Sequence, residues 1–150
     1  MLLRIVLASC SILVAGAIAT AQEDPIRAHK DLMKIQGRYG YVVLPRMVRG
    51  QDPYDQAKID QAFTDLTDTT EKLPRLWPES AKPTGPSSDE YSASPKIWEN
   101  KADFEARLTK FANDVADYRG KVTDLDSLKV AFTVIRQNCD SCHELYRVKN

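Results

Sequence analysis

The side chains with the most distinctive chemistry lie together in one pentapeptide near the C-terminus, Cys139-Asp140-Ser141-Cys142-His143. Two thiols at this spacing can bond to the two vinyl groups of one porphyrin, and the adjacent imidazole can ligate its iron. On a helix, Cys139, Cys142 and His143 share one face, because they lie at positions i, i+3 and i+4. The Cys-x-x-Cys-His spacing therefore predicts one covalent haem c, attached at both cysteines and ligated by His143.

Three other uses of the same cysteines are less consistent with the sequence. A disulfide between residues i and i+3 in mid-helix would close a very short loop and stabilise the fold little. A thioredoxin-like pair belongs at a helix N-terminus after a strand, and no such pattern precedes Cys139. A zinc site would need His29, the only other histidine, and a fourth ligand.

The sixth iron position decides between two functions, and the sequence offers two methionines for it. Met33 is close to the start of the first predicted helix, and Met47 is 14 residues further on, or about 21 Å along a helix. If the first and last helices are antiparallel neighbours, Met33 lies at the height of His143 and Met47 lies at the far end. Methionine is also a common filler of hydrophobic cores, so spacing alone leaves both roles of Met33 open.

Apolar spacing and capping residues predict four helices that could position these groups. The first runs from Asp24-Pro25 to about Val48, with Leu32, Ile35, Tyr39 and Val42 on its buried face and with a kink or early end at Pro45. The second starts at Asp52-Pro53 and stops at Pro74. The third starts at Ser94-Pro95 and stops at Gly120. The fourth runs from about Asp124 to the end of the chain.

Apolar residues on each predicted helix recur in alternating steps of three and four, as at the seam of helices that cross at shallow angles. The fourth stripe contains Leu128, Ile135 and both cysteines of the motif, so the haem would enter the bundle interior. We expect an all-α fold, an antiparallel up-down-up-down four-helix bundle with covalently bound haem. The proline-rich stretch 74–95 is expected to be an irregular loop, which is long for a minimal bundle.

Residues 1–21 have the pattern of a cleaved secretory signal peptide: Arg4, an apolar run and the small residues Ala19-Thr20-Ala21. The run is too short for a membrane helix. It also continues past Cys10, which disfavours a lipoprotein site. We therefore expect a periplasmic domain at 22–150 without a membrane span. Lys plus Arg and Asp plus Glu both number 21, and this balance does not favour a nucleic-acid partner.

Three further segments make the chain similar to the class II cytochromes c, the cytochromes c′ and their low-spin relatives. They are Gly50-Gln51-Asp52-Pro53-Tyr54-Asp55, Ser94-Pro95-Lys96-Ile97-Trp98 and the Tyr146-Arg147 pair after the haem motif. The resemblance spans nearly all of the expected mature chain and implies a four-helix bundle with haem near the C-terminus. It also implies redox partner proteins in the periplasm, and homodimers occur in the family.

Within this family the residue facing the distal side from the first helix separates two functions. A methionine there implies six-coordinate, low-spin iron and electron transfer, whereas a non-ligating residue implies a five-coordinate cytochrome c′ that binds nitric oxide or carbon monoxide. The Leu32-Met33-Lys34 segment is similar to the first group and implies that Met33 is an iron ligand. Many relatives carry an arginine one turn earlier that contacts a haem propionate. His29 stands there, so His29 or Lys30 takes that contact or both are merely solvated.

Arg147 lies four residues beyond His143 and is a further candidate for a haem-edge contact, although a basic residue is also favourable at any helix C-terminus. The leading hypothesis is one-electron transfer without substrate turnover, so the protein is expected to be an electron carrier and not an enzyme. The alternative is gas binding by a five-coordinate haem. A third hypothesis is a haem-free helical interaction module closed by a disulfide.

Overall fold

The computed structural model describes residues 24–150, so the predicted signal peptide, 1–21, lies outside the described residues. The described part of the chain begins with one long helical segment made of α1 (Pro25–Gly37), the π-helical η1 (Arg38–Val43) and α2 (Leu44–Val48). The three other long helices are α3 (Gln56–Lys72), α5 (Lys101–Tyr118) and α6 (Leu125–Tyr146). Among the described residues, no helix has the length and apolar character needed to cross a bilayer.

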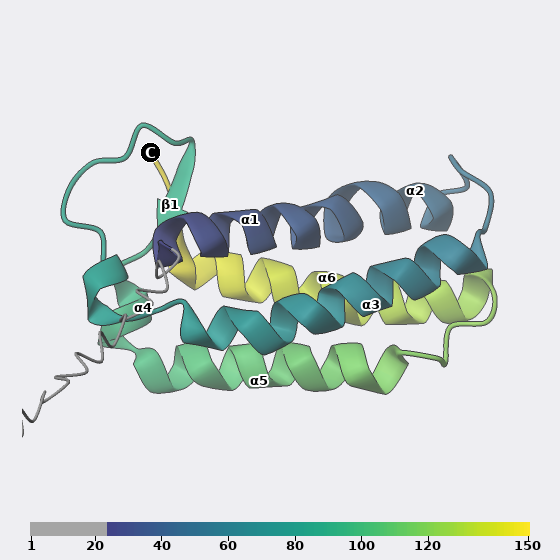
Figure 1. Cartoon of the computed structure of the whole chain (residues 1–150). Coiled ribbons are helices and arrows are strands. Elements are labelled where there is room, and N and C mark those ends of the chain that lie inside the picture. Colours follow the sequence, from purple (N-terminus) through teal and green to yellow (C-terminus); the bar gives the residue numbers. More distant parts are fainter. Residues whose placement is uncertain (1–23) are drawn as a thin grey trace, which may run out of the picture.

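The four long helical segments pack side by side with their axes nearly parallel and their chain directions alternating (Figure 1). α3 packs against α1 and α5, and α6 packs against α5 and α2, so the helices close into a bundle. This arrangement confirms the predicted up-down-up-down four-helix bundle. The haem motif near the end of α6 and the first turns of α1 lie at the same end of the bundle (Figure 1).

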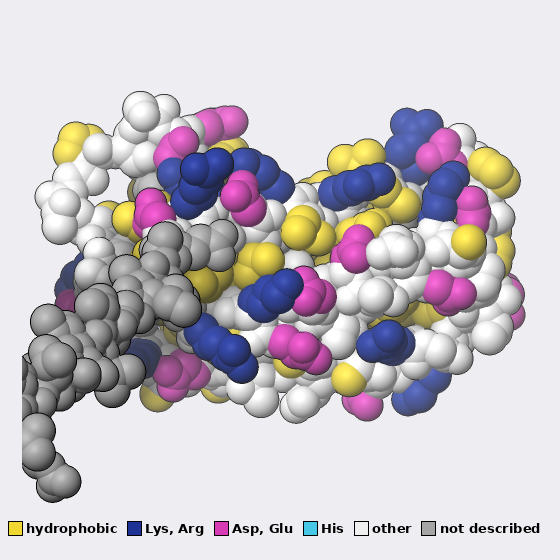
Figure 2. Space-filling view, viewed as in Figure 1, with side chains coloured by type: hydrophobic (Ala, Val, Ile, Leu, Met, Phe, Trp, Pro, Cys, Tyr) yellow, Lys and Arg dark blue, Asp and Glu magenta, His cyan; other side chains and the backbone are white. Residues whose placement is uncertain are grey.

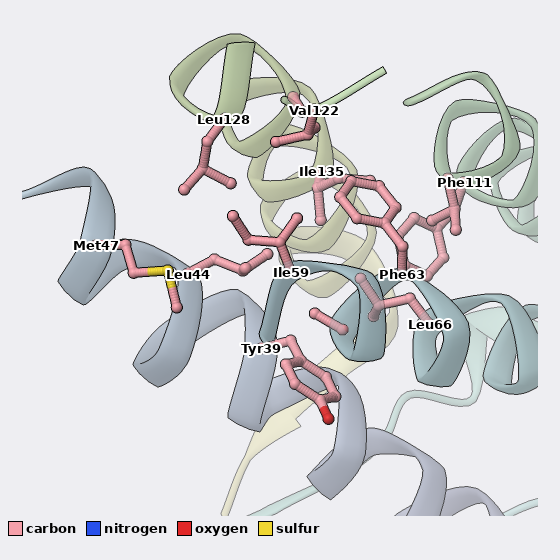
Figure 3. Packing of buried hydrophobic residues seen from close by; sticks show 13 residues of the cluster. Tyr39, Leu44, Met47, Ile59, Phe63, Leu66, Phe111, Val122, Leu128 and Ile135 are labelled. Carbon is pink, nitrogen blue, oxygen red and sulfur yellow. The ribbon is translucent and has the colours of Figure 1, made fainter. Parts of the chain in front are cut away.

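Two hydrophobic clusters divide the interior along its length. The larger cluster contains Leu44, Ile59, Leu66 and Leu128, all of them less than 2% exposed (Figure 3). Through Met47, Val122 and Leu128 it extends to the end of the bundle opposite the haem motif. The smaller cluster includes Leu73, Ile97, Phe104, Leu108 and Tyr146, with Met33 and Cys142 packed against it. The motif thus joins the apolar interior, as its place on the predicted stripe of α6 required.

The second predicted helix begins three residues later than expected, after Asp55 instead of at Asp52-Pro53. The Asp55 carboxylate accepts the backbone N–H of Lys58 at 3.2 Å and caps α3. Asp52 is engaged elsewhere, because the guanidinium of Arg46 donates to both of its oxygens at 2.8 Å. The Asp-Pro pair therefore lies in the turn before the helix.

Pro45 does not end the first helical segment early, since α2 continues to Val48. The π-helix η1 comes just before it, and the Leu44 N–H donates to the carbonyl of Tyr39, five residues earlier. A proline has no N–H and crowds the carbonyl four residues before it, so the wider turn accommodates Pro45. The turn also changes the phase of the helix: Val42, expected on the buried face, is 52% exposed.

The connection 74–95 contains more regular structure than expected. It includes the short 3₁₀ turns η2 (Leu73–Arg75) and η3 (Glu79–Ala81) and the strand β1 (Tyr91–Ala93). β1 pairs antiparallel with β2 (Arg147–Lys149), with Ser92 opposite Val148. The predicted fourth helix thus ends at Tyr146 and not at the chain end, and the strand pair lies beside the start of α1 (Figure 1).

The predicted third helix also has an interruption near its start. A four-residue helix, α4 (Lys96–Glu99), ends at Asn100, and α5 begins with the next residue. The Ser94 hydroxyl accepts the Lys96 N–H at 3.2 Å, so Ser94-Pro95 does initiate a helical turn as predicted. At the other end, Gly120 has φ +78°, a conformation that favours glycine and stops α5.

Candidate haem site

A cavity of about 750 Å³ lies between α1, α5, α6 and the β1–β2 strand pair. Cofactor pockets typically measure roughly 300–1,000 Å³, so the volume suits a group of haem size. Its wall is mostly apolar and aromatic, with Leu73, Trp77, Phe104, Leu108 and Phe111 among the lining residues. The cavity also brings together every site residue predicted from the sequence: His29, Lys30, Met33, Cys139, Cys142, His143 and Arg147.

Cys139 and Cys142 reach the cavity from α6 as free thiols. Burial raises the pKa of Cys139 to about 11 and also raises the pKa of Cys142. Both thiols therefore keep their protons at neutral pH, unlike the reactive thiolate of a thioredoxin-like pair. η1 and α6 approach each other here, since a Cβ added at Gly40 of η1 would lie 3.7 Å from the Cys139 sulfur, in ordinary van der Waals contact.

His143 lies on the same face of α6, partly buried in the cavity wall. Burial lowers its pKa to about 4, with a smaller contribution from the charge of Arg147. The imidazole is therefore neutral at physiological pH, which is the form that ligates metals. Its Nδ1 lies 3.4 Å from the Tyr41 hydroxyl, and Nε2 is the nitrogen left for a ligand.

Met33 lines the cavity from α1, whereas Met47 is buried in the larger cluster at the other end of the bundle. The thioether of Met33 and the imidazole of His143 thus border one cavity from two helices that are far apart in sequence. Histidine and methionine together are a known pair of axial ligands in cytochromes c. This arrangement has the donor set that six-coordinate haem iron needs.

The three predicted haem-edge residues also line the cavity but already have partners in the protein. The centre of the His29 ring lies 4.9 Å from the centre of the Trp77 ring, and His29 Nδ1 is 3.3 Å from the Pro25 carbonyl oxygen. Lys30 forms an ion pair with Asp89 at 2.5 Å. The Arg147 guanidinium lies 4.5 Å from the ring centre of Tyr91 on β1. Contact with a haem carboxylate would add to these interactions or replace them.

Sequence reasoning missed two residues that shape the site. Arg107 of α5 donates from Nη1 to the Ser141 carbonyl at 3.2 Å and so holds the backbone of the haem motif. The indole N–H of Trp77 is buried in the cavity wall and has no hydrogen-bond partner among the residues that the structure describes. An unpaired buried donor is costly to the fold. The position of Arg107 beside Leu108 on the stripe was the only available signal for that residue.

Other metal chemistry finds less support in the geometry. Within residues 24–150, no three His, Cys, Asp or Glu side chains are placed to hold a metal ion together, so the zinc alternative has no ligand set.

On the face seen in Figure 2, basic and acidic side chains are interspersed instead of forming one patch of a single sign. The haem-sized cavity is therefore the feature that the predicted site residues share.

Comparison with known proteins agrees with this description. A family model described as cytochrome C′ matches residues 24–147. A cytochrome c-556 of Rhodopseudomonas palustris is 39% identical over 149 residues, which cover 99% of both chains. A cytochrome c-555 of Bradyrhizobium diazoefficiens is 38% identical over 138 residues, covering 92% of this chain and 91% of that protein. The solved structure of cytochrome c′ from Rhodopseudomonas palustris matches with a TM-score of 0.76 and 32% identity, covering 86% of this chain and 99% of that one.

Proposed function

The chain belongs to the cytochrome c′ family and binds haem c, and from that premise we propose that it transfers single electrons in the periplasm through six-coordinate, low-spin iron. The observation that carries this proposal is the presence of Met33 and His143 in the wall of one haem-sized cavity. Cys139 and Cys142 are proposed to hold the porphyrin covalently. His143 and Met33 are proposed as the axial ligands.

When bound, haem c supplies a one-electron change at iron, and the protein supplies position and environment. The apolar wall excludes water from the iron and thereby raises the influence of nearby charges on its reduction potential. A thioether ligand from Met33 would raise that potential relative to a second imidazole. These roles require no proton transfer to a substrate, in keeping with an electron carrier that is not an enzyme.

The rim of the cavity has donors for the two haem carboxylates. Lys30 and Arg147 supply positive charge near the same opening, beside Asp89 and Tyr91 respectively. His29 packs on Trp77 and would fix the indole orientation more than it would bind haem directly.

We propose that residues 1–21 direct export and are removed, so that 22–150 form the mature cytochrome domain. Haem c is attached to exported proteins outside the cytoplasm, and the predicted signal peptide agrees with that location. Redox partner proteins in the periplasm and a homodimer stay predictions from the family resemblance. The redox partners and the homodimer would both be sought with the haem-loaded protein.

The deciding measurement is the visible absorption spectrum of the reduced protein before and after carbon monoxide is added. The protein should be exported from a host that attaches haem c. Sharp, well-separated bands that do not respond to carbon monoxide are expected, because Met33 would fill the sixth position. A broad high-spin spectrum that shifts with the gas would overturn the proposal. Gas binding by five-coordinate iron would then be the function.

A further inference from the structure

Tyr41 lies beside the haem motif, although it is not on the apolar stripe predicted for the first helix. It lies on η1, where the π-helical turn changes the direction of successive side chains. Its hydroxyl comes within 3.4 Å of His143 Nδ1 on α6, a residue 102 positions later in the chain. π-Helical turns occur often at functional sites. We therefore ask what the contact between Tyr41 and His143 could do for the haem.

The same hydroxyl also faces a carboxylate of the haem motif. Tyr41 Oη lies 3.3 Å from Asp140 Oδ1, and the second carboxylate oxygen of Asp140 accepts from Arg136 Nε at 2.8 Å. The Arg136 guanidinium lies 3.9 Å from the ring centre of Tyr41 and covers one face of it. Asp140 and the Tyr41 ring are therefore both fixed by one arginine. The two Tyr41 contacts are long for hydrogen bonds but within reach of both partners.

The direction of these contacts follows from the chemistry of the groups. A histidine that ligates iron through Nε2 carries its proton on Nδ1, so Nδ1–H can donate to the Tyr41 oxygen. The Tyr41 O–H can then donate to the Asp140 carboxylate, which accepts only. Partners of this kind orient a ligating imidazole and increase its basicity. A more basic imidazole stabilises ferric iron and so lowers the reduction potential.

We propose that Tyr41 is a positioning residue that links the Nδ1–H of His143 to the Asp140 carboxylate and thereby lowers the reduction potential of the haem. The inference rests on the proposed ligation of iron by His143, although it does not depend on the sixth ligand. It gives the π-helical turn a function, because this turn brings the Tyr41 hydroxyl to α6.

The test compares reduction potentials of the full, haem-loaded protein. Tyr41→Phe removes only the hydroxyl and keeps the ring under Arg136, so the fold is expected to be retained. The matched control is Tyr39→Phe, which removes a hydroxyl from the same segment where it bonds to Asp65, outside the cavity lining. A higher potential in Tyr41→Phe and an unchanged potential in Tyr39→Phe are expected. Equal potentials in Tyr41→Phe and the unmodified protein, or equal shifts in both variants, would overturn the proposal.

A second variant separates a hydrogen-bonded link from the simple loss of negative charge. Asp140→Asn alone should raise the potential, but its effect should be smaller when Tyr41 is already Phe, because the link is then broken. Equal effects of Asp140→Asn in both backgrounds would mean that the carboxylate acts through space and that Tyr41 does not transmit it.

Failure of the inference is distinguishable from failure of the proposed function. If carbon monoxide binds to the reduced, unmodified protein, the six-coordinate proposal fails. The Tyr41 proposal can then still be tested by the iron–imidazole stretching frequency in the resonance Raman spectrum of five-coordinate ferrous haem. That frequency is expected to fall in Tyr41→Phe and to stay the same in Tyr39→Phe. An unchanged frequency in Tyr41→Phe would overturn the Tyr41 proposal alone.

Discussion

Met33 and Met47 lie on one continuous helical segment but in two separate parts of the interior: Met33 borders the haem-sized cavity, and Met47 is 1% exposed in the larger cluster. This separation provides a matched pair of substitutions. Leucine has nearly the volume of methionine, and such exchanges usually cost less than about 1.5 kcal/mol of stability. A spectral change confined to one of the two variants would therefore come from lost ligation.

Met33→Leu is expected to remove the sixth iron ligand and to make the reduced protein bind carbon monoxide. Met47→Leu should leave the spectrum and the lack of response to carbon monoxide unchanged. Both are measured by visible absorption of the reduced protein with and without the gas. An unaltered low-spin spectrum in Met33→Leu would remove Met33 from the ligand set.

Replacing both Cys139 and Cys142 with alanine is expected to abolish covalent haem attachment, because no other thiol lies in the expected mature chain. The denatured polypeptide should then have the mass of the protein alone by mass spectrometry. Ser141→Ala, between the two cysteines, is the control and should keep the mass of one attached haem. A haem adduct on the double variant would contradict the assigned attachment sites.

Asp124→Ala is expected to destabilise the bundle by about 1 kcal/mol, the usual cost of losing an N-terminal helix cap. The Asp124 carboxylate accepts the Ser127 N–H at 2.8 Å, and the Ser127 hydroxyl accepts the Asp124 N–H at 3.1 Å. Chemical denaturation of the haem-loaded protein measures the change. The control is Asp126→Ala in the same turn, where the side chain is 91% exposed and the cost should stay below about 0.5 kcal/mol. Equal losses in both variants would argue against the cap.

Tyr146 should make the stability of the protein depend on alkaline pH. Burial, together with a 2.6 Å hydrogen bond to Asp103, raises its pKa to about 12, against about 10 for an unfolded tyrosine. The contribution of Tyr146 to the unfolding free energy is complete below about pH 10. It declines from about pH 10 to about pH 12, because only the unfolded chain loses the proton over that range. Tyr146→Phe should therefore show a shallower alkaline decline of the unfolding free energy, and an identical decline would contradict the shifted pKa.

Much of the fold follows from local sequence, and particular residues show why. Asp124 is followed at once by an amphipathic stretch, and α6 begins there as expected, with the Asp124 side chain as its cap. Ile97, Phe104, Leu108, Phe111 and Val115 are all buried, as their spacing predicted. Spacing of three and four residues fixes a helix and its apolar face together, because both depend on neighbours within two turns.

The wrong predictions concern segments whose local sequence fits more than one structure. Asp52 and Asp55 are both suitable caps, and the tertiary ion pair of Asp52 with Arg46 leaves the role to Asp55. Val42 fits the apolar stripe of an α-helix, but the π-helical turn before Pro45 moves it to the surface. The C-terminal residues become a strand only because β1 is available to pair with them.

The sequence by itself determined the cofactor chemistry and the bundle, because haem attachment needs only two thiols and an imidazole within five residues of one helix. Tertiary structure alone decided which groups surround that motif. The contact between Tyr41 and His143 joins residues 102 positions apart, and the ion pair of Lys30 with Asp89 joins residues 59 apart. Such contacts depend on the phase and packing of whole helices, and one π-helical turn is enough to change which side chain meets His143.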